Sequence, residues 1–340
     1  MLRCLLLLPF LWLSCQGTPT APQTPPADTD APPLALAVSP VDTAVTEALF
    51  GKAPEFTVLF GGMEWAEGPL VLPDGGVICS DVPKNQILRW TGSGSSVYLE
   101  GSGAAPNDYS GEPGSNGLHL DAAGRLLLCQ HGARRIARMD APLDDPQPVF
   151  VTVADNYDGK KFNSPNDLVV APDGSILFTD PTYGLPGQRE SPLRELDFQG
   201  VFRIRPDGSV QLLSDAYVQP NGIGLSPDGK TLYVADSDRS RLTVTATPIL
   251  DENYRLGPGD TLINARSLVG KAEGSTDGLA VAKNGRIFAT APGGVWVIEP
   301  DGRLLSKIST GQRVANVELA PQEDYLYLTS DYYLIRLKLL

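Results

Sequence analysis

The chain has 340 residues and a formal net charge of −13, from 27 Lys and Arg against 40 Asp and Glu. This length allows a substantial hydrophobic core, in one large domain or two average ones. The acidic balance gives no general electrostatic attraction to a phosphate backbone, which argues against nucleic acid as a partner. The 35 Gly and 30 Pro are spread through the chain, which favours a fold with many tight turns.

The first residues are typical of an export signal. Arg3 precedes an apolar run over residues 5–14, which is too short to span a bilayer as a helix, and Cys15 follows that run. The ending Cys-Gln-Gly resembles a bacterial lipoprotein signal, in which Cys15 would be lipidated, and ordinary signal-peptidase cleavage is the alternative. We expect an exported protein that is periplasmic, anchored to the outer membrane or secreted, with a membrane contact only through this lipid.

Residues 1–15 are therefore assigned to the signal, and residues 16–50 to a tether that begins rich in Pro, Thr and Ala. The folded domain is expected over residues 51–340. It contains two of the four cysteines, Cys79 and Cys129, each within a strand-like run. We expect buried free thiols, with a single disulfide as the alternative, and the Cys and His spacing does not indicate a structural zinc site.

Six segments share one plan: a polar residue, an apolar alternating strand, a tight turn and a second strand. They begin at residues 66, 115, 164, 219, 275 and 313. In the first five segments the turn carries a glycine that suits a positive φ, and these glycines recur every 49 to 56 residues: Gly75, Gly124, Gly174, Gly229 and Gly285. The sixth turn has Glu323 followed by Asp324, which predicts a different turn geometry.

Each unit continues with a third strand, and most units add a fourth, outer strand. The last unit ends at Leu340 without an outer strand, whereas an unmatched strand, residues 56–62, precedes the first unit. We therefore predict an all-β, six-bladed β-propeller, closed by an N-terminal strand that joins the last blade and removes an exposed sheet edge. A β-sandwich is the alternative, but it explains neither the repeat nor the matched ends.

The innermost strands of a propeller line its central channel, so aligned positions in the repeats converge on one axis. The aligned position near the start of the first five inner strands holds an oxygen-bearing residue: Glu67, Asn116, Asn166, Asn221 and Asp277. In the sixth unit it holds Ala315, with Asn316 beside it. Asn-Gly and Asp-Gly are common turn dipeptides, but a turn rule does not explain five such residues in register.

Two of these five side chains are carboxylates and three are carboxamides. A buried, unpaired carboxylate is costly in free energy, and a bound cation removes that cost. Ligands that offer only oxygen favour a hard ion, so we expect Ca²⁺ first, with Mg²⁺, Mn²⁺ or Zn²⁺ as alternatives.

The motifs WAEGP, SPNDLVV, QPNGIGLSPD and STDGLAV together resemble the senescence-marker-protein/gluconolactonase/luciferin-regenerating-enzyme-like family of calcium-dependent lactonases. The resemblance covers about residues 56–340. It implies a divalent ion held by four side chains that match the family's motifs: Glu67, Asn166, Asn221 and Asp277. It also implies hydrolysis of a sugar lactone, in which the cation polarises the carbonyl and Asp277 assists the attack of water.

Asn116, His131 and Tyr183 are expected to contact the substrate, with packing in its loop as the alternative for His131. Asp180 is expected to bond backbone amides in its turn. Other lactones or organophosphate esters are alternative substrates, because an ion that polarises C=O also polarises P=O. A non-catalytic ligand-binding propeller is the remaining alternative, and it predicts a channel without clustered carboxylates. The sequence contains no nucleophile elbow, phosphate loop or dinucleotide fingerprint.

Overall fold

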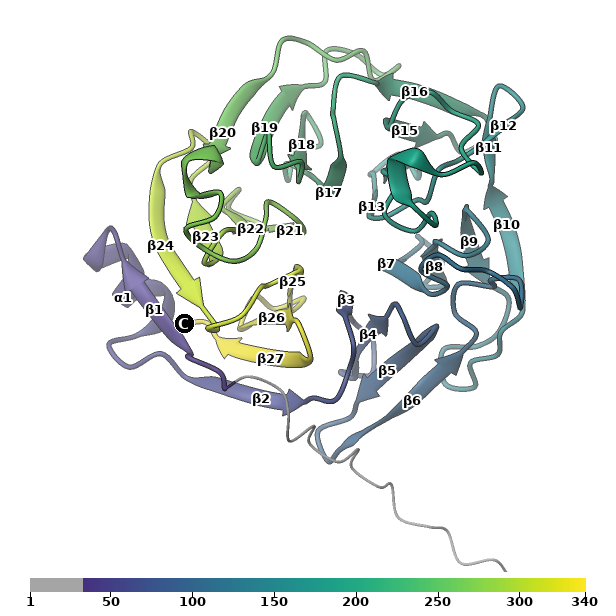
Figure 1. Ribbon diagram of the computed structural model, residues 1–340. Helices are drawn as coiled ribbons and strands as arrows, with labels where there is room; N and C mark the ends of the chain where they lie inside the picture. The colour runs from purple at the N-terminus through teal and green to yellow at the C-terminus, as the bar shows by residue number, and fades with distance from the viewer. Residues whose placement is uncertain (1–32) are drawn as a thin grey trace, which may run out of the picture.

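The computed structural model describes residues 33–340, so the expected signal and the first part of the expected tether lie outside the described residues. Six sheets of antiparallel strands stand like blades around one axis (Figure 1). The predicted six-bladed β-propeller is confirmed.

In each blade the strands run outward from the channel. Blade 1 contains β3 (Ala66–Val71), β4 (Val77–Asp81), β5 (Gln86–Trp90) and β6 (Ser95–Glu100). Blade 2 contains β7 (Ser115–Leu120), β8 (Leu126–Gln130), β9 (Arg135–Met139) and β10 (Phe150–Ala154). Blade 3 contains β13 (Leu168–Val170), β14 (Ile176–Asp180), β15 (Gly200–Ile204) and β16 (Val210–Ser214).

The second half of the ring follows the same order. Blade 4 contains β17 (Pro220–Leu225), β18 (Thr231–Asp236), β19 (Thr243–Pro248) and β20 (Asp260–Asn264). Blade 5 contains β21 (Leu279–Val281), β22 (Ile287–Ala291), β23 (Gly294–Ile298) and β24 (Leu304–Ser309). Blade 6 contains β25 (Asn316–Leu319), β26 (Tyr325–Ser330) and β27 (Tyr333–Lys338). The connections add β11 (Asn156–Tyr157), β12 (Lys160–Lys161) and the 3₁₀ helices η1 (Gln188–Glu190) and η2 (Arg266–Leu268).

The N-terminal part of the described chain joins the last two blades. Strand β2 (Phe56–Phe60) pairs with β27 and is the outermost strand of blade 6. Strand β1 (Ala37–Pro40) pairs with β24, which gives blade 5 a fifth strand. Helix α1 (Thr43–Phe50) lies between them in sequence, and Phe50 packs into the hydrophobic cluster shared by blades 5 and 6.

The assignment of residues 16–50 to a tether is therefore wrong for its last part. Composition is rich in Pro only up to about residue 40, and the residues beyond it include a helix N-cap signal that the composition obscured. The Asp42 side chain accepts a hydrogen bond from the Val45 N–H at 3.1 Å, as N-cap residues do.

The hydrophobic core lies between neighbouring blades. Between blades 2 and 3, Phe162, Phe178 and Phe202 are fully buried, with ring centroids 5.0 to 5.4 Å apart. Cys79 and Cys129 are buried free thiols, as predicted, and burial raises the pKa of both. Because the apolar side chains pack between the blades, oxygen-bearing side chains are left to face the channel.

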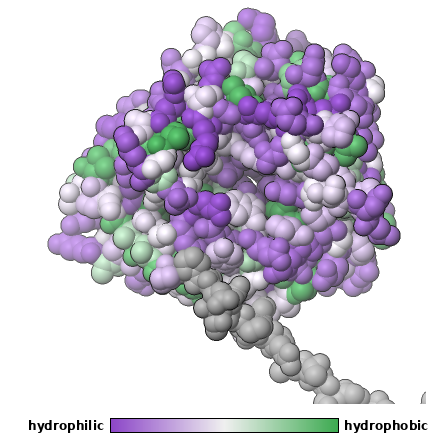
Figure 2. Space-filling view, viewed as in Figure 1, coloured by the Kyte–Doolittle hydropathy of each residue, from purple (hydrophilic) through white to green (hydrophobic). Residues whose placement is uncertain are grey.

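The outer surface is mainly hydrophilic on the face that Figure 2 shows, where hydrophobic residues form small scattered patches. Within residues 33–340, the one α-helix is too short to cross a bilayer.

The predicted turn glycines all adopt a positive φ, between 68° and 88°. A Cβ would have open space or ordinary contacts at four of them, and at Gly285 it would lie 3.2 Å from Pro300. The sixth turn, however, does not differ as predicted. Glu323 has φ 59°, and its N–H donates to the Ala320 carbonyl at 2.8 Å, as the turn glycines do to theirs. The Glu323 carboxylate accepts a hydrogen bond from the Lys283 N–H of blade 5 at 2.6 Å, which helps to hold this less favourable conformation.

A second set of glycines brings the inner strands together. A Cβ atom on Gly68 would lie 2.3 Å from the Asn116 carbonyl oxygen, and one on Gly222 would lie 2.2 Å from the Asp277 carbonyl oxygen. The Gly222 N–H donates to the same Asp277 oxygen at 3.0 Å. The glycine after an aligned polar residue is therefore required for close approach of the next blade, and not for a turn.

Because of this packing, Gly222→Ala should lower the free energy of unfolding by about 2 to 3 kcal/mol, the usual cost of forcing atoms into a closely packed site. Gly94→Ala is the matched control, because a Cβ on Gly94 has no atom within 4 Å. Chemical denaturation of both variants measures the difference. Equal stability of the two variants would contradict the close-approach requirement.

Candidate functional site

A cavity of about 400 Å³ opens at one end of the channel. It is lined by all four predicted metal ligands and by two of the three predicted substrate contacts: Glu67, Asn116, Asn166, Asn221, Asp277 and Tyr183. Residues from five blades thus meet in one pocket, as the alignment of the repeats predicted.

The inner strands place these side chains in the same way. Glu67, Asn116 and Asn221 are each the second residue of an inner strand. Asn166 and Asp277 lie two residues before β13 and β21, where threonines of the adjacent strands hold the backbone. The Asn166 N–H donates to the Thr179 carbonyl at 2.9 Å, and the Asp277 N–H donates to Thr290 Oγ1 at 2.7 Å.

Several oxygen atoms at the base of the pocket have no hydrogen-bond donor. The Oδ1 atoms of Asn116, Asn166 and Asp277 are buried and have no hydrogen-bond partner within residues 33–340. Glu67 is 3% exposed; its carboxylate accepts a hydrogen bond from the Gly68 N–H at 3.2 Å, and the Asn316 side chain also lies against it. An acceptor left unpaired in the interior costs about 1 to 3 kcal/mol, so three of them in one pocket indicate a missing partner.

A cation would serve as that partner. Among residues 33–340 no group of three or more His, Cys, Asp or Glu side chains is placed to share a metal ion. The pocket instead combines two carboxylates with carboxamide oxygens, a donor set that suits a hard divalent cation. The side chains present therefore fit the predicted cation.

The electrostatics of the pocket support the same conclusion. Burial, and then the negative charges of Asp277 and Asp167, raise the pKa of Glu67 well above its usual value. Burial, and then the charge of Asp167, raise the pKa of Asp277 to about 8. Burial raises the pKa of Asp167 to about 7. Among the described residues that shift these three pKa values there is no cationic side chain to offset the negative charges. The charged form of each carboxyl group is therefore disfavoured.

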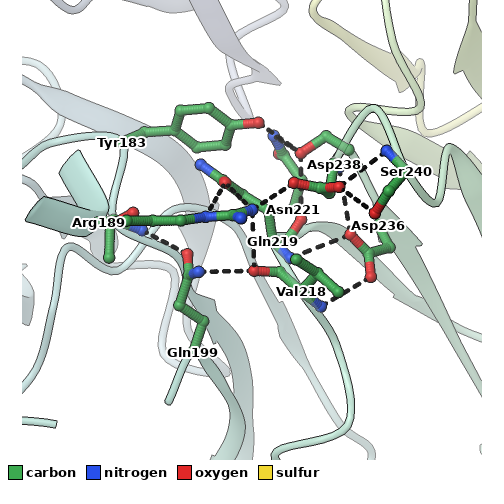
Figure 3. A network of polar contacts seen from close by, with 11 residues as sticks. Tyr183, Arg189, Gln199, Val218, Gln219, Asn221, Asp236, Asp238 and Ser240 are labelled. Carbon is green, nitrogen blue, oxygen red and sulfur yellow. Dashed lines mark hydrogen bonds and ion pairs between the residues drawn. The ribbon is translucent and has the colours of Figure 1, made fainter. Parts of the chain in front are cut away.

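Tyr183 belongs to a polar network that joins blades 3 and 4 (Figure 3). Its hydroxyl lies 2.6 Å from Ser237 Oγ, and Asn221 Nδ2 donates to the same Ser237 oxygen at 3.5 Å. Arg189 donates to the Gln219 side chain at 2.7 Å and forms an ion pair with Asp238. Burial raises the pKa of Tyr183, so the hydroxyl stays protonated at the wall of the pocket.

His131 does not line the pocket, and its side chain packs within a loop, which is the alternative that the sequence left open. The imidazole is 0% exposed, and its Nδ1 atom lies 3.1 Å from Glu112 Oε2. Glu112 is the residue that reaches the cavity. The sequence placed His131 at the end of a strand but did not reveal that a preceding loop covers it.

Further residues of the pocket wall were not predicted, namely Trp65, Glu112, Arg239, Glu273 and Arg313. Four of them come from the connections between blades, and Arg239 comes from the loop between β18 and β19 within blade 4; these loops vary in length and carry no repeat. Their place in the sequence could have indicated them, since four of the five lie two to four residues before an aligned residue of the repeat. Arg313 forms an ion pair with Asp331 at 2.8 Å and lies 4.5 Å above the Trp65 ring.

Blade 6 closes the base of the pocket. The Asn316 Oδ1 atom accepts a hydrogen bond from the Val317 N–H at 2.8 Å, and the side chain lies against Glu67 and Asp167. Asn316 lines a second cavity at the other end of the channel. Asp180 accepts hydrogen bonds from two backbone N–H groups at 2.8 Å, but these belong to Asn163 and Ser164 in the segment before β13 and not, as was predicted, to its own turn.

Comparison with known proteins gives one family. The model of the SMP-30/Gluconolactonase/LRE-like region matches residues 65–332. The chain is 36% identical over 302 residues to a protein of Zymomonas mobilis named gluconolactonase, which covers 86% of this chain and 83% of the relative.

Solved structures agree. A gluconolactonase from Xanthomonas campestris superposes with a TM-score of 0.76 and 31% identity, over 91% of this chain and 98% of that one. The calcium-binding protein regucalcin from Agrobacterium tumefaciens has the same fold, with a TM-score of 0.63 and 17% identity over 83% of this chain and 93% of that one.

The raised pKa values predict how stability depends on pH when no cation is present. A carboxyl whose folded pKa lies above its unfolded value stabilises the fold below the unfolded pKa, and this contribution is lost as pH rises through the folded pKa. In chelator, the free energy of unfolding should therefore fall between about pH 4 and pH 8, the pKa range of Asp277. Each pKa unit corresponds to about 1.4 kcal/mol.

Asp277→Asn provides the comparison, because the amide cannot ionise. Denaturation in chelator from pH 5 to pH 9 should show a smaller decline for this variant than for the wild type. An identical pH dependence of both proteins would show that Asp277 ionises freely in the fold.

Proposed function

The chain belongs to the SMP-30/Gluconolactonase/LRE-like family, and on that premise we propose that it is a metal-dependent hydrolase that opens a sugar lactone. One observation supports the proposal most directly: the unpartnered oxygens of Asn116, Asn166 and Asp277 meet in one pocket beside the buried Glu67 carboxylate. The relative that is 36% identical is named a gluconolactonase, which favours this substrate class.

Four side chains would hold the cation: Glu67, Asn166, Asn221 and Asp277. Two carboxylates balance a double charge, and oxygen ligands at this number favour Ca²⁺, which accepts roughly six to eight oxygens and so leaves places for water and substrate. When bound, the cation would supply Lewis-acid polarisation of the lactone carbonyl.

Asp277 would move the proton in this reaction. As water attacks the carbonyl carbon, the carboxylate accepts one proton of that water while the new C–O bond forms. The ring C–O bond then breaks, and the proton passes to the ring oxygen that leaves, so the product is the open hydroxy acid. The pocket keeps the Asp277 Oδ1 atom free of protein donors, which leaves it available for this proton.

Asn116 and Tyr183 are suited to bind the substrate. The Asn116 oxygen faces the pocket without a partner, and the protonated Tyr183 hydroxyl, which also lines the pocket, can donate or accept a hydrogen bond. Their polar groups match the hydroxyls of a sugar lactone better than a purely apolar ring. Export through the signal over residues 1–15, with lipidation at Cys15, remains our proposal for where the enzyme acts.

Asp277→Asn should lower kcat for gluconolactone by about 100-fold or more, because a positioned base contributes about 10² to 10⁴ to the rate. Thermal unfolding should show a folded protein. Asp207→Asn is the control, since Asp207 lies on an exposed turn, and it should leave the rate unchanged. Undiminished hydrolysis by purified Asp277→Asn would remove Asp277 from the mechanism.

Cation binding should be tighter at pH 8.5 than at pH 6, because protons on Glu67 and Asp277 compete with the ion. Calorimetric titration of chelator-treated protein with Ca²⁺ measures this. Glu67→Gln should weaken binding, and chelation should abolish lactone hydrolysis until Ca²⁺ or another divalent ion is returned. Full activity in chelator, with no heat of Ca²⁺ binding, would contradict metal dependence.

A further inference from the structure

We propose that Glu112 is a specificity-determining residue of this hydrolase, whose carboxylate accepts hydrogen bonds from ring hydroxyls of the lactone, and that His131 is the residue that positions it. The inference rests on the proposed lactone hydrolysis. It concerns a side chain outside the set that would hold the cation, on a loop that joins blades 1 and 2.

The loop that carries Glu112 is held firmly against blade 3. The Glu112 N–H donates to the Gly184 carbonyl at 3.1 Å, and the Tyr109 hydroxyl donates to the same oxygen at 2.6 Å. A Cβ on Gly111 would lie 2.2 Å from that oxygen, so the two backbones are in close contact. The backbone position of Glu112 at the cavity wall is therefore fixed by packing and hydrogen bonds.

His131 fixes the side chain. Its backbone N–H donates to the Gly114 carbonyl at 3.1 Å, and a Cβ on Gly184 would lie 2.6 Å from the ring, so the imidazole is tightly enclosed. The Nε2 atom is buried and has no hydrogen-bond partner within residues 33–340. Glu112 is the polar partner of the ring, and because a carboxylate only accepts hydrogen bonds, the Nδ1–H of the imidazole is the donor.

This arrangement occupies one carboxylate oxygen and leaves the other available. His131 bonds to Oε2, while the Glu112 side chain is 41% exposed and lines the cavity. A carboxylate only accepts hydrogen bonds, so it suits the hydroxyl donors of a sugar ring and forms no hydrogen bond with a lactone ring that lacks hydroxyls. A site built to bond a hydroxyl discriminates against a substrate without it, because the polar group is then left unpaired.

Two lactones with the same ring test the role of Glu112: gluconolactone, which carries ring hydroxyls, and δ-valerolactone, which carries none. For Glu112→Ala we expect kcat/KM on gluconolactone to fall roughly 10- to 100-fold, mostly through KM, as for loss of a hydrogen bond to a charged group. Hydrolysis of δ-valerolactone should change less than about twofold on the same grounds. Glu100→Ala, at the exposed end of β6, is the matched control with both rates unchanged.

His131 is tested by exchange of its donor. Asn at position 131 places an amide N–H near the Nδ1 position, whereas Leu places none there. His131→Leu should therefore lose the preference for gluconolactone as Glu112→Ala does, and His131→Asn should restore most of it. The ratio of the two substrates within one variant does not depend on the fraction of folded protein, so partial unfolding does not obscure the result.

The outcomes separate this inference from the proposed function. An active wild type, with a Glu112→Ala variant that slows both lactones equally or neither, overturns the role of Glu112 alone. His131→Asn and His131→Leu variants with the same preference overturn the role of His131. A wild type that opens neither lactone contradicts the proposed function itself, and the inference fails with it.

Discussion

The close approach of the inner strands at single glycines is the constraint on which the site depends. Each of Gly68, Gly117, Gly222 and Gly278 follows an aligned polar residue, and each leaves no room for a Cβ beside the next blade. A larger residue there would separate the blades and, with them, the side chains that face the axis. The aligned residue thus supplies a polar side chain, and the glycine after it permits the close contact between blades that sets the distance of this side chain from its neighbours.

This convergence has an electrostatic consequence. The blades bring Glu67, Asp167 and Asp277 close enough that burial and mutual repulsion raise the pKa of the first and the last. Carboxylates held together against their charge favour a cation, as the proposed function requires, and the unpartnered amide oxygen of Asn166 would offer a further ligand without adding charge. Ionisation of these buried carboxyl groups therefore costs stability, and strongly shifted pKa values of this kind are common at functional centres.

The sequence was sufficient to predict the parts of the structure that follow the repeat, and insufficient to predict the parts that lie in loops. The period of the turn glycines predicted the blades, and alignment of the repeats predicted that Glu67, Asn166, Asn221 and Asp277 meet, because every blade obeys the same geometry. The geometry of the Glu323 turn was mispredicted. Glu323 adopts the conformation of a turn glycine, and its side chain accepts a hydrogen bond from the neighbouring blade 5 that helps to hold it. Glu112 escaped notice because its loop is placed by contacts with Gly184 of another blade, which no local pattern encodes.

The proposed function requires four blades to deliver their oxygens to one divalent ion. Anomalous X-ray scattering from crystals grown with Ca²⁺, or with Mn²⁺ as a stronger scatterer, would locate that ion. One strong peak is expected about 2.3 to 2.6 Å from oxygens of Glu67, Asn166, Asn221 and Asp277. A pocket without such a peak at saturating metal, or a peak bound elsewhere while the pocket holds only water, would contradict this requirement.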